Sequence, residues 1–493
     1  MSITRRSLLG ATATAGVLAA TGLPAFAAPA AGQGPAKQAA KAAGQRLLST
    51  LADNGKVALP QGFRAWRVGT IGVEDLLSDR NGSPIGTTPS KLDGTGAFDY
   101  AGGIRLVRNH ECRADTDVTV PLVAGTVYDA GIATGMGGNT VVELDASGRF
   151  KQQWVALSGT IRNCAGGETP WGSWLACEED TTKAGTEIIR GGKSWGTTQK
   201  DHGYVFEVFP DVVAQQSPLP IKAWGRAVWE GAAIDPDLTK AYITEDTGRG
   251  LLYRWTAPEG TKLGAYIAEQ FGENDGVLQA AQVIRNGVPL VHYGQLTADD
   301  VDQAYPVKWV DGGEDRQAQT MNLRDQYPGA TQHPKVEGCW PDAEGLWFTL
   351  SFTNQGQIDS YRKSHGIDMP GDWGMIGYYR FADETITIKD HYAKDNTAGG
   401  VVPGDATEDV KQFHGPDNIT VNSRGLVVIT EDGNNPCSML AMSHTKKSVE
   451  FARDLADRGE WAGPCFNKSG TMLFSNIQGD CTYAITGPFN AIL

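Results

Sequence analysis

A short unit of loop, turn and strand recurs six times along the chain, at irregular separations. In each copy the turn precedes an apolar strand, and a polar residue ends that strand six places after the turn. The turns end at Gly103, Gly172, Thr239, Gly345, Gly425 and Gly470. The polar residues are Asn109, Glu178, Glu245, Ser351, Glu431 and Asn476. Repetition of this kind is typical of a radially repeated all-β fold.

The residues that precede the turns also match between copies. Eight or nine places before the end of the turn, the four central copies have Cys164, Glu230, Glu337 and Asp417, whereas the first and last copies offer Asp93 and Ala462 less regularly. We predict an all-β fold, a β-propeller of about six blades with long loop insertions. Because one strand of each blade lines a central channel, equivalent residues should converge on the axis, and most of them are acidic.

Between the repeated units, the sequence alternates aromatic strands with long irregular segments. Aromatic strands at residues 202–208, 250–255, 377–381 and 481–485 are predicted to form outer layers of the blades. Residues 112–140, 181–201, 256–330 and 382–412 are predicted to be loops or short helices, with helical candidates at 280–285 and 297–303.

The N-terminus indicates export. Residues 1–27 combine Arg5-Arg6, a short apolar stretch and a small-residue cleavage signal, which is typical of a twin-arginine signal peptide. A membrane anchor is disfavoured because the apolar stretch is too short to span a bilayer, so we expect no stable membrane insertion. Residues 28–55 are predicted to be a disordered lead-in, and residues 56–493 a single domain. We expect a secreted or extracytoplasmic protein that contacts the twin-arginine export machinery transiently.

Charge and cysteine content narrow the function classes. The net charge of −14 argues against a nucleic-acid partner, because proteins that bind nucleic acid present a basic surface to it. An acid-lined channel needs cations instead. The seven cysteines are an odd number, so at least one thiol is unpaired within the chain.

An ordered set of motifs carries a family resemblance from about residue 60 to the end. The motifs are Asn109-His110-Glu111, Asn163-Cys-Ala-Gly-Gly167, Thr169-Pro-Trp-Gly172, Cys177-Glu-Glu179, Glu230-Gly231, Tyr242-Ile-Thr-Glu-Asp246, Glu337-Gly338, Pro416-Asp-Asn-Ile419 and Ile485-Thr-Gly-Pro488. In this order they resemble the PhoX-type alkaline phosphatases.

The resemblance implies a secreted phosphomonoesterase with Fe³⁺ and Ca²⁺ clustered on the propeller axis. It implies that Cys164 is a thiolate ligand of iron and that Asn418 lies near the phosphate ester. Lys335 stands where the family typically has an arginine that grips the phosphate. The carboxylates implied as ligands of iron and calcium are Glu179, Glu230, Glu337 and Asp417.

The residue chemistry agrees with a metal site. Calcium prefers several oxygen donors, and a thiolate suits a transition metal. Glu178 and Glu179 point to opposite faces of a regular strand, so only one should reach the axis, and the resemblance selects Glu179. Glu111 is a further candidate for calcium.

Several polar residues are open to a purely structural role. For Glu245, Asp246, Glu431 and Asp432, accepting hydrogen bonds from turn amides is as well supported as metal binding. His110 and His414 are more often hydrogen-bonded structural residues than ligands.

Two functions from different classes therefore remain. The first is a metal-dependent phosphatase acting on small phosphate monoesters. The second is a catalytically inactive, calcium-stabilised propeller that binds a partner or a carbohydrate. A propeller hydrolase of another ester or a lactone is less favoured, because Cys164 has no place in such a site.

Overall fold

The computed structural model describes residues 48–132, 136–211, 218–367, 369, 374–392, 413–432 and 437–492. The predicted signal peptide (residues 1–27) and residues 28–47 of the predicted lead-in lie outside the described residues. All the described residues belong to one unit, residues 40–493. In that described part, no helix combines the length and the apolar character needed to cross a membrane.

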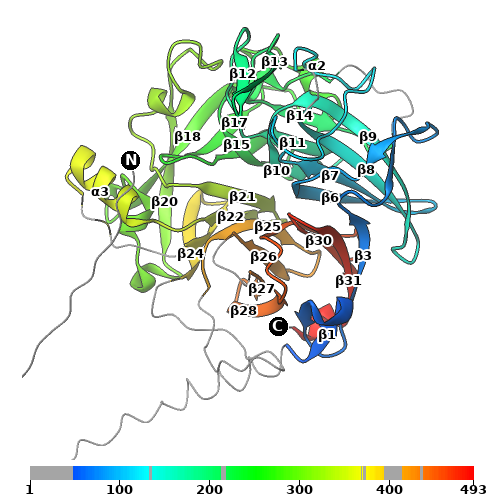
Figure 1. Cartoon of the computed structure of the whole chain (residues 1–493). Helices are drawn as coiled ribbons and strands as arrows, with labels where there is room; N and C mark the ends of the chain where they lie inside the picture. Colours follow the sequence, from blue (N-terminus) through cyan, green and yellow to red (C-terminus); the bar gives the residue numbers. More distant parts are fainter. Residues whose placement is uncertain are drawn as a thin grey trace, which may run out of the picture. The chain divides into compact units, whose positions relative to one another are not determined.

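Six innermost strands form a closed ring within the described residues (Figure 1). Each packs against the next in chain order, and the last packs against the first, which closes the circle. They are β6 (Leu92–Tyr100), β10 (Asn163–Glu168), β15 (Trp229–Ile234), β21 (Val336–Pro341), β25 (Pro416–Val421) and β29 (Trp461–Phe466). The predicted propeller of about six blades is therefore confirmed.

A second strand pairs antiparallel with each innermost strand. These second strands are β7 (Gly103–His110), β11 (Trp174–Glu178), β16 (Lys240–Glu245), β22 (Gly345–Leu350), β26 (Val427–Glu431) and β30 (Met472–Ile477). Each begins at or within two residues of one of the six predicted turns. The sequence repeat thus corresponds to the inner hairpin of each blade.

The outer strands complete the blades. The third strands are β8 (Gly137–Asp145), β14 (Val205–Val208), β17 (Leu252–Thr256), β23 (Met375–Arg380), β27 (Ser438–Ser443) and β31 (Cys481–Thr486). Five of the six blades have a fourth strand. These strands are β9 (Phe150–Thr160), β18 (Val277–Arg285), β24 (Thr385–His391), β28 (Lys446–Asp454) and β3 (Arg64–Thr70). Strands β14, β17, β23 and β31 confirm the predicted aromatic outer layer.

Both ends of the described chain contribute to one blade. Strand β3 pairs with the C-terminal strand β31, with Arg64 opposite Thr486 and Thr70 opposite Cys481. Strands β1 (Thr50–Ala52) and β2 (Val57–Leu59) extend the neighbouring sheet through β28. Strand β1 lies inside the stretch predicted as a lead-in, and Asp53 after it forms a salt bridge with Arg67.

The insertions contain more strand than the sequence predicts. The predicted helix at residues 280–285 is wrong: this stretch belongs to β18, which pairs with β17 and with β20 (Ala304–Asp311). Strand β20 also pairs with β24, so two blades share one ten-stranded sheet. Pairing with two strands satisfies the backbone of β18 on both edges, which outweighs its local helical character.

The remaining elements are short. The strands are β4 (Asp75–Leu77), β5 (Pro84–Thr87), β12 (Glu187–Arg190), β13 (Lys193–Thr197) and β19 (Val288–Pro289). The helices are α2 (Ile267–Gln270) and α3 (Gln355–His365), and the 3₁₀ turns are η1 (Asp53–Gly55), η2 (Lys222–Trp224), η3 (Tyr293–Gln295), η4 (Ala298–Asp300), η5 (Leu323–Gln326) and η6 (Phe489–Ala491). Of the helix predicted at 297–303, only η4 forms.

The hydrophobic core lies between adjacent blades. One cluster joins Leu175 and Val205 of the second blade to Trp229, Ile243 and Tyr253 of the third. Burying a large apolar side chain contributes about 2 kcal/mol, so these interfaces hold the blades side by side. The inner ends of the strands are thereby kept close to the axis.

Candidate metal and active site

The second residue of the innermost strand repeats around the ring. In blade order it is Asp93, Cys164, Glu230, Glu337, Asp417 and Ala462. These are the positions that the repeat aligns in the sequence. Five of the six are acids or a thiol, and only the last blade has an apolar residue there.

A β-bulge accompanies this position in every blade. Register between the first two strands shifts just after the innermost strand begins, for example between Asn163 and Gly166 and between Trp229 and Ala232. The same shift occurs in the other four blades. Bulges interrupt the hydrogen-bond pairing between two strands and redirect side chains. Here the interruption falls at the acidic and thiol residues.

Small residues next to the bulge let the innermost strands approach each other closely. A Cβ on Gly94 would lie 2.6 Å from the Cα of Ala165 in the next blade. A Cβ on Gly338 would lie 2.9 Å from the Cα of Asn418. Backbone atoms cannot yield as flexible side chains can, so glycine at these places sets the narrow width of the ring.

The aligned side chains meet in one cluster. The sulfur of Cys164 lies 3.4 Å from Oε1 of Glu230 and 3.6 Å from Oδ2 of Asp93. Ligand atoms of Cys164, Glu179 and Glu230 lie within 4.8 Å of one another. The structure therefore brings together three residues that the sequence separates by up to 66 positions.

A second group of acids adjoins the first through Glu230. Carboxylate oxygens of Glu230, Asp246 and Glu337 lie within 4.8 Å of one another. Asn418 connects Asp417 to this group. Its Nδ2 donates to Oε1 of Glu230 at 3.3 Å and to Oδ1 of Asp417 at 3.2 Å. All the residues predicted as ligands on the four central blades are thus contiguous.

The two neighbouring acids of β11 separate as expected. Glu178 is fully buried away from the axis and accepts hydrogen bonds from the His202 ring and the backbone N–H of Gly203. Glu179 instead forms a salt bridge with Arg162 at 2.5 Å and joins Cys164. The predicted choice of Glu179 therefore matches its position.

Most of the polar residues that end the second strands form hydrogen bonds within the fold. Asn109 donates to the backbone carbonyls of Cys164 and Ala165 at 2.8 and 2.7 Å. Glu245 binds Arg324 and the hydroxyl of Tyr253. Of the residues open to either role, Glu245 is thus a structural acceptor.

The same distinction holds in the fifth blade. Glu431 accepts hydrogen bonds from the backbone N–H groups of His414 and Ser438. The acid that follows it, Asp432, instead lines a cavity described below, just as Asp246 joins the cluster after Glu245. The residue that follows the strand end is therefore the one that faces the site.

Cationic residues stand two places before three of the aligned residues. Lys91, Arg162 and Lys335 all have positive φ, at 54°, 51° and 59°. This left-handed conformation is uncommon for residues other than glycine and often occurs at functional sites. Arg162 and Lys335 reach acids from this conformation, and Lys91 reaches Gln478.

Each of the three cations binds the cluster or its rim. Nζ of Lys335 lies 2.5 Å from Oε1 of Glu337 and 3.5 Å from Oδ2 of Asp246. Nη2 of Arg162 lies 2.5 Å from both Glu111 and Glu179. Lys91 donates to Oε1 of Gln478 at 2.7 Å. Lys335 therefore lies in the cluster, where the sequence predicts it.

A third group of acids forms the mouth of the site. Oxygens of Asp93, Glu111 and Glu460 lie within 4.8 Å of one another. Glu111 and Glu460 line a cavity of about 740 Å³, whose wall also includes Asp432. Glu111 thus lies next to the predicted ligands, on the open side.

The cluster carries a strong electrostatic penalty. Burial and the charge of Glu111 raise the pKa of Asp93 to about 8. Burial and Asp246 raise the pKa of Glu337 to about 8, although Lys335 offsets part of the effect. Burial, followed by the charge of Asp93, raises the pKa of the Cys164 thiol well above its usual value. Only additional positive charge would allow all these groups to ionise together.

The two histidines considered as ligands differ in what their rings contact. Both ring nitrogens of His110 are hydrogen-bonded, to the carbonyl of Ser90 and the hydroxyl of Thr140, and burial lowers its pKa well below the usual value. The His414 ring stacks on Phe352, with ring centroids 4.7 Å apart.

Sequence reasoning missed Glu460 and Arg162. Glu460 directly precedes β29, and its blade has the apolar Ala462 at the aligned position. Comparing the residue two places before each aligned position would have found both Arg162 and Glu460. No motif of its own marks either one.

The fold and the site define a six-bladed β-propeller protein with a buried cluster of carboxylates and one thiol at its axis. The model of the alkaline phosphatase PhoX family matches residues 46–480. The chain belongs to this family and is therefore a phosphoric monoester hydrolase.

Similarity to one solved structure, the first of the two named here, supports the fold. Pseudomonas fluorescens PhoX, in complex with vanadate as a transition-state analogue, is 16% identical with a TM-score of 0.63, over 90% of this chain and 97% of that chain. The holo PQQ domain of pyranose dehydrogenase from Coprinopsis cinerea is 9% identical with a TM-score of 0.40, over 89% of this chain and 100% of that chain. No curated protein matches this sequence significantly.

Proposed function

We propose that the protein hydrolyses small phosphate monoesters at a group of metal ions held on the propeller axis. The observation that carries this proposal is the convergence of one equivalent residue from five blades on a single buried cluster. The proposed ligands are Cys164, Glu179, Glu230, Glu337, Asp417 and Glu111. The family itself uses metal ions.

The residues present fit metal ions. Oδ1 of Asp93 and Oε2 of Glu230 are buried and have no hydrogen-bond partner among the described residues. An unsatisfied buried carboxylate oxygen is costly, and a cation would satisfy it. Cys164 supplies a soft donor for Fe³⁺, and the surrounding carboxylates supply hard donors for Ca²⁺.

Bound cations would neutralise the carboxylates, stabilise charge on the phosphate and lower the pKa of a bound water. The chain itself would orient the ester. Lys335 offers an ammonium group beside Glu337 and Asp246, and Asn418 offers its Nδ2 beside Glu230. These two side chains are the proposed contacts to the phosphate oxygens.

Asn418 is held in place for this role. Its Oδ1 accepts a hydrogen bond from the backbone N–H of Gly463 at 2.7 Å, which orients Nδ2 toward the acids. Metal ions on Glu230 and Asp417 would take the place of the two hydrogen bonds from Nδ2, which would then be positioned to donate to the phosphate.

The proposed site of action is outside the cytoplasm. The twin-arginine signal predicted at residues 1–27 supports export by the twin-arginine machinery, followed by release without membrane insertion. Cellular fractionation of the full chain and of an Arg5-Arg6→Lys-Lys variant would test this, since a cytoplasmic wild-type protein would contradict it.

Hydrolysis of p-nitrophenyl phosphate by protein purified without chelator tests the phosphatase proposal. Cys164→Ala and Glu337→Gln should each lower kcat/KM by more than about a hundredfold, because each removes a proposed ligand. Glu259→Gln, at an exposed position, is the matched control. Metal analysis should find a transition metal with calcium in the wild type and loss of the transition metal in Cys164→Ala.

The alternative of an inactive, calcium-stabilised propeller predicts a different result. Calcium alone, with equal residual rates for wild type and both variants, would contradict the proposed catalytic site.

A further inference from the structure

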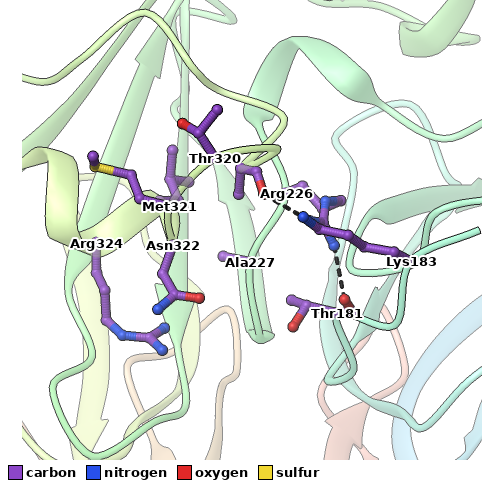
Figure 2. Close-up of a pocket in the computed structure, with 10 residues that line it drawn as sticks. Thr181, Lys183, Arg226, Ala227, Thr320, Met321, Asn322 and Arg324 are labelled. Atoms are coloured by element: carbon purple, nitrogen blue, oxygen red, sulfur yellow. Dashed lines mark hydrogen bonds between the residues drawn. The ribbon is translucent and has the colours of Figure 1, made fainter. Parts of the chain in front are cut away.

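A second cavity has a volume of about 260 Å³ (Figure 2). Its walls come from the segment after β11, the segment before β15 and the insertion before β21. They are formed by Thr181, Lys183, Arg226, Ala227, Ala318, Thr320, Met321, Asn322, Leu323 and Arg324. The lining contains three cationic side chains and no acid, in a chain whose net charge is −14.

Arg226 places a buried positive charge in the wall of this cavity, and Asp201, whose charge it influences, is not part of the lining. The side chain is 2% exposed, and its guanidinium donates to four backbone carbonyls, those of Thr181, His202, Gln317 and Ala318. Within the described part of the chain, no carboxylate lies within salt-bridge distance of it. Because a guanidinium has five N–H groups, one remains available.

The other two cations also retain donors. Lys183 is exposed and uses one N–H on the carbonyl of Gln319, at 2.9 Å. Arg324 binds Glu245 through Nη1 alone, at 2.5 Å. Arginine presents its donors in a fixed fork that matches a carboxylate or a phosphate. The wall of the cavity can therefore bind an anion from several sides.

The cavity is within reach of the proposed reaction centre. Thr181 is two residues after Glu179, so their Cα atoms are at most about 8 Å apart. Arg324 binds Glu245, whose neighbour Asp246 belongs to the cluster. An ester whose phosphate lies at the cluster could place its other end here.

We propose that this cavity binds a second anionic group, carried by the alcohol part of the phosphate monoester. The inference rests on the proposed function and adds a substrate class: phosphomonoesters with a carboxylate or a further phosphate several atoms from the scissile group. The enzyme then favours such esters over those whose alcohol part is uncharged.

Two matched substrates test this selectivity. 6-Phosphogluconate and glucitol 6-phosphate share an open six-carbon chain and a terminal phosphate, and differ in having a carboxylate or a hydroxymethyl group at the other end. For metal-loaded wild-type protein, kcat/KM should be at least about fivefold higher for 6-phosphogluconate than for glucitol 6-phosphate. This is the advantage expected when the carboxylate contacts one exposed cation, Lys183, and one buried cation, Arg226.

Variants at two exposed lining residues locate the effect. Lys183→Gln should reduce the ratio of the two kcat/KM values about threefold, and Met321→Glu should reduce it further by repelling the carboxylate. Met321→Gln is the uncharged control for the second variant. Lys262→Gln, at an exposed lysine elsewhere, is the control for the first.

The outcomes separate this inference from the proposed function. Equal kcat/KM values for the two esters, or a ratio unchanged by both Lys183→Gln and Met321→Glu, would overturn the cavity assignment and leave the phosphatase intact. Absence of hydrolysis of either ester and of p-nitrophenyl phosphate would overturn both.

Discussion

We expect His202 to make the protein less stable as the pH rises through the alkaline range. Its ring bridges two buried acids: Nδ1 lies 2.7 Å from Glu178 and Nε2 lies 3.3 Å from Asp129. All three side chains are fully buried. Burial alone would lower the pKa of His202, but the charges and hydrogen bonds of Glu178 and Asp129 raise it to about 9.

The sign follows from proton linkage. Because the folded pKa lies above the ordinary value of 6.5, the folded protein holds a proton that the unfolded chain loses first. The stabilisation is complete below about pH 6.5 and is lost as the pH rises through about 9. A change from 6.5 to about 9 corresponds to about 3 kcal/mol of unfolding free energy.

Urea unfolding of wild type and His202→Gln at several pH values isolates this contribution. The difference in unfolding free energy should narrow by about 3 kcal/mol between about pH 6 and about pH 10, because glutamine carries no titrating proton. His444→Gln, which removes a half-exposed ring bonded to Asp342, is the control and should change the unfolding free energy by no more than about 1 kcal/mol. A difference for His202→Gln that does not change with pH would refute the reasoning.

Three further predictions concern the axis. Adding Ca²⁺ to chelator-treated protein, at about a thousand times its Kd, should raise the unfolding free energy by about 4 kcal/mol in denaturant titrations, and no change would argue against a calcium site. Lys335→Gln should lower kcat/KM for p-nitrophenyl phosphate roughly tenfold to a hundredfold, whereas Lys335→Arg, which keeps the charge, should retain most activity; equal losses would exclude a charge-based role. Gly338→Ala should cost about 1–3 kcal/mol in thermal unfolding, because its Cβ would lie 2.9 Å from the Cα of Asn418, and Gly248→Ala, with open space around it, should be neutral.

The architecture of the inner hairpins was predictable from local chemistry. The turns at Gly172 and Gly425 have positive φ, 89° and 81°, which glycine adopts without strain. Each turn precedes a short apolar strand, and the fixed spacing places Cys164 and Asp417 at the same point of their blades. The equivalence of these two residues therefore follows from the spacing in the sequence.

The sequence failed where long-range pairing competes with local preference. Residues 280–285 form part of β18, because β17 and β20 supply hydrogen bonds along both edges. Their helical character has no bearing once those neighbours are present. Glu460 was also missed, since it belongs to no motif and only its place two residues before the aligned Ala462 distinguishes it from a solvent-exposed acid.

The sequence by itself determined the repeated unit, its all-β class and the acids and thiol that mark its equivalent points. Only the tertiary structure decided which polar side chains face the axis. Glu178 and Glu179 illustrate the difference, because one binds His202 inside a blade and the other joins Cys164. Spacing along a strand sets the side to which a residue points, whereas closure of the ring sets the residues from other blades that it meets.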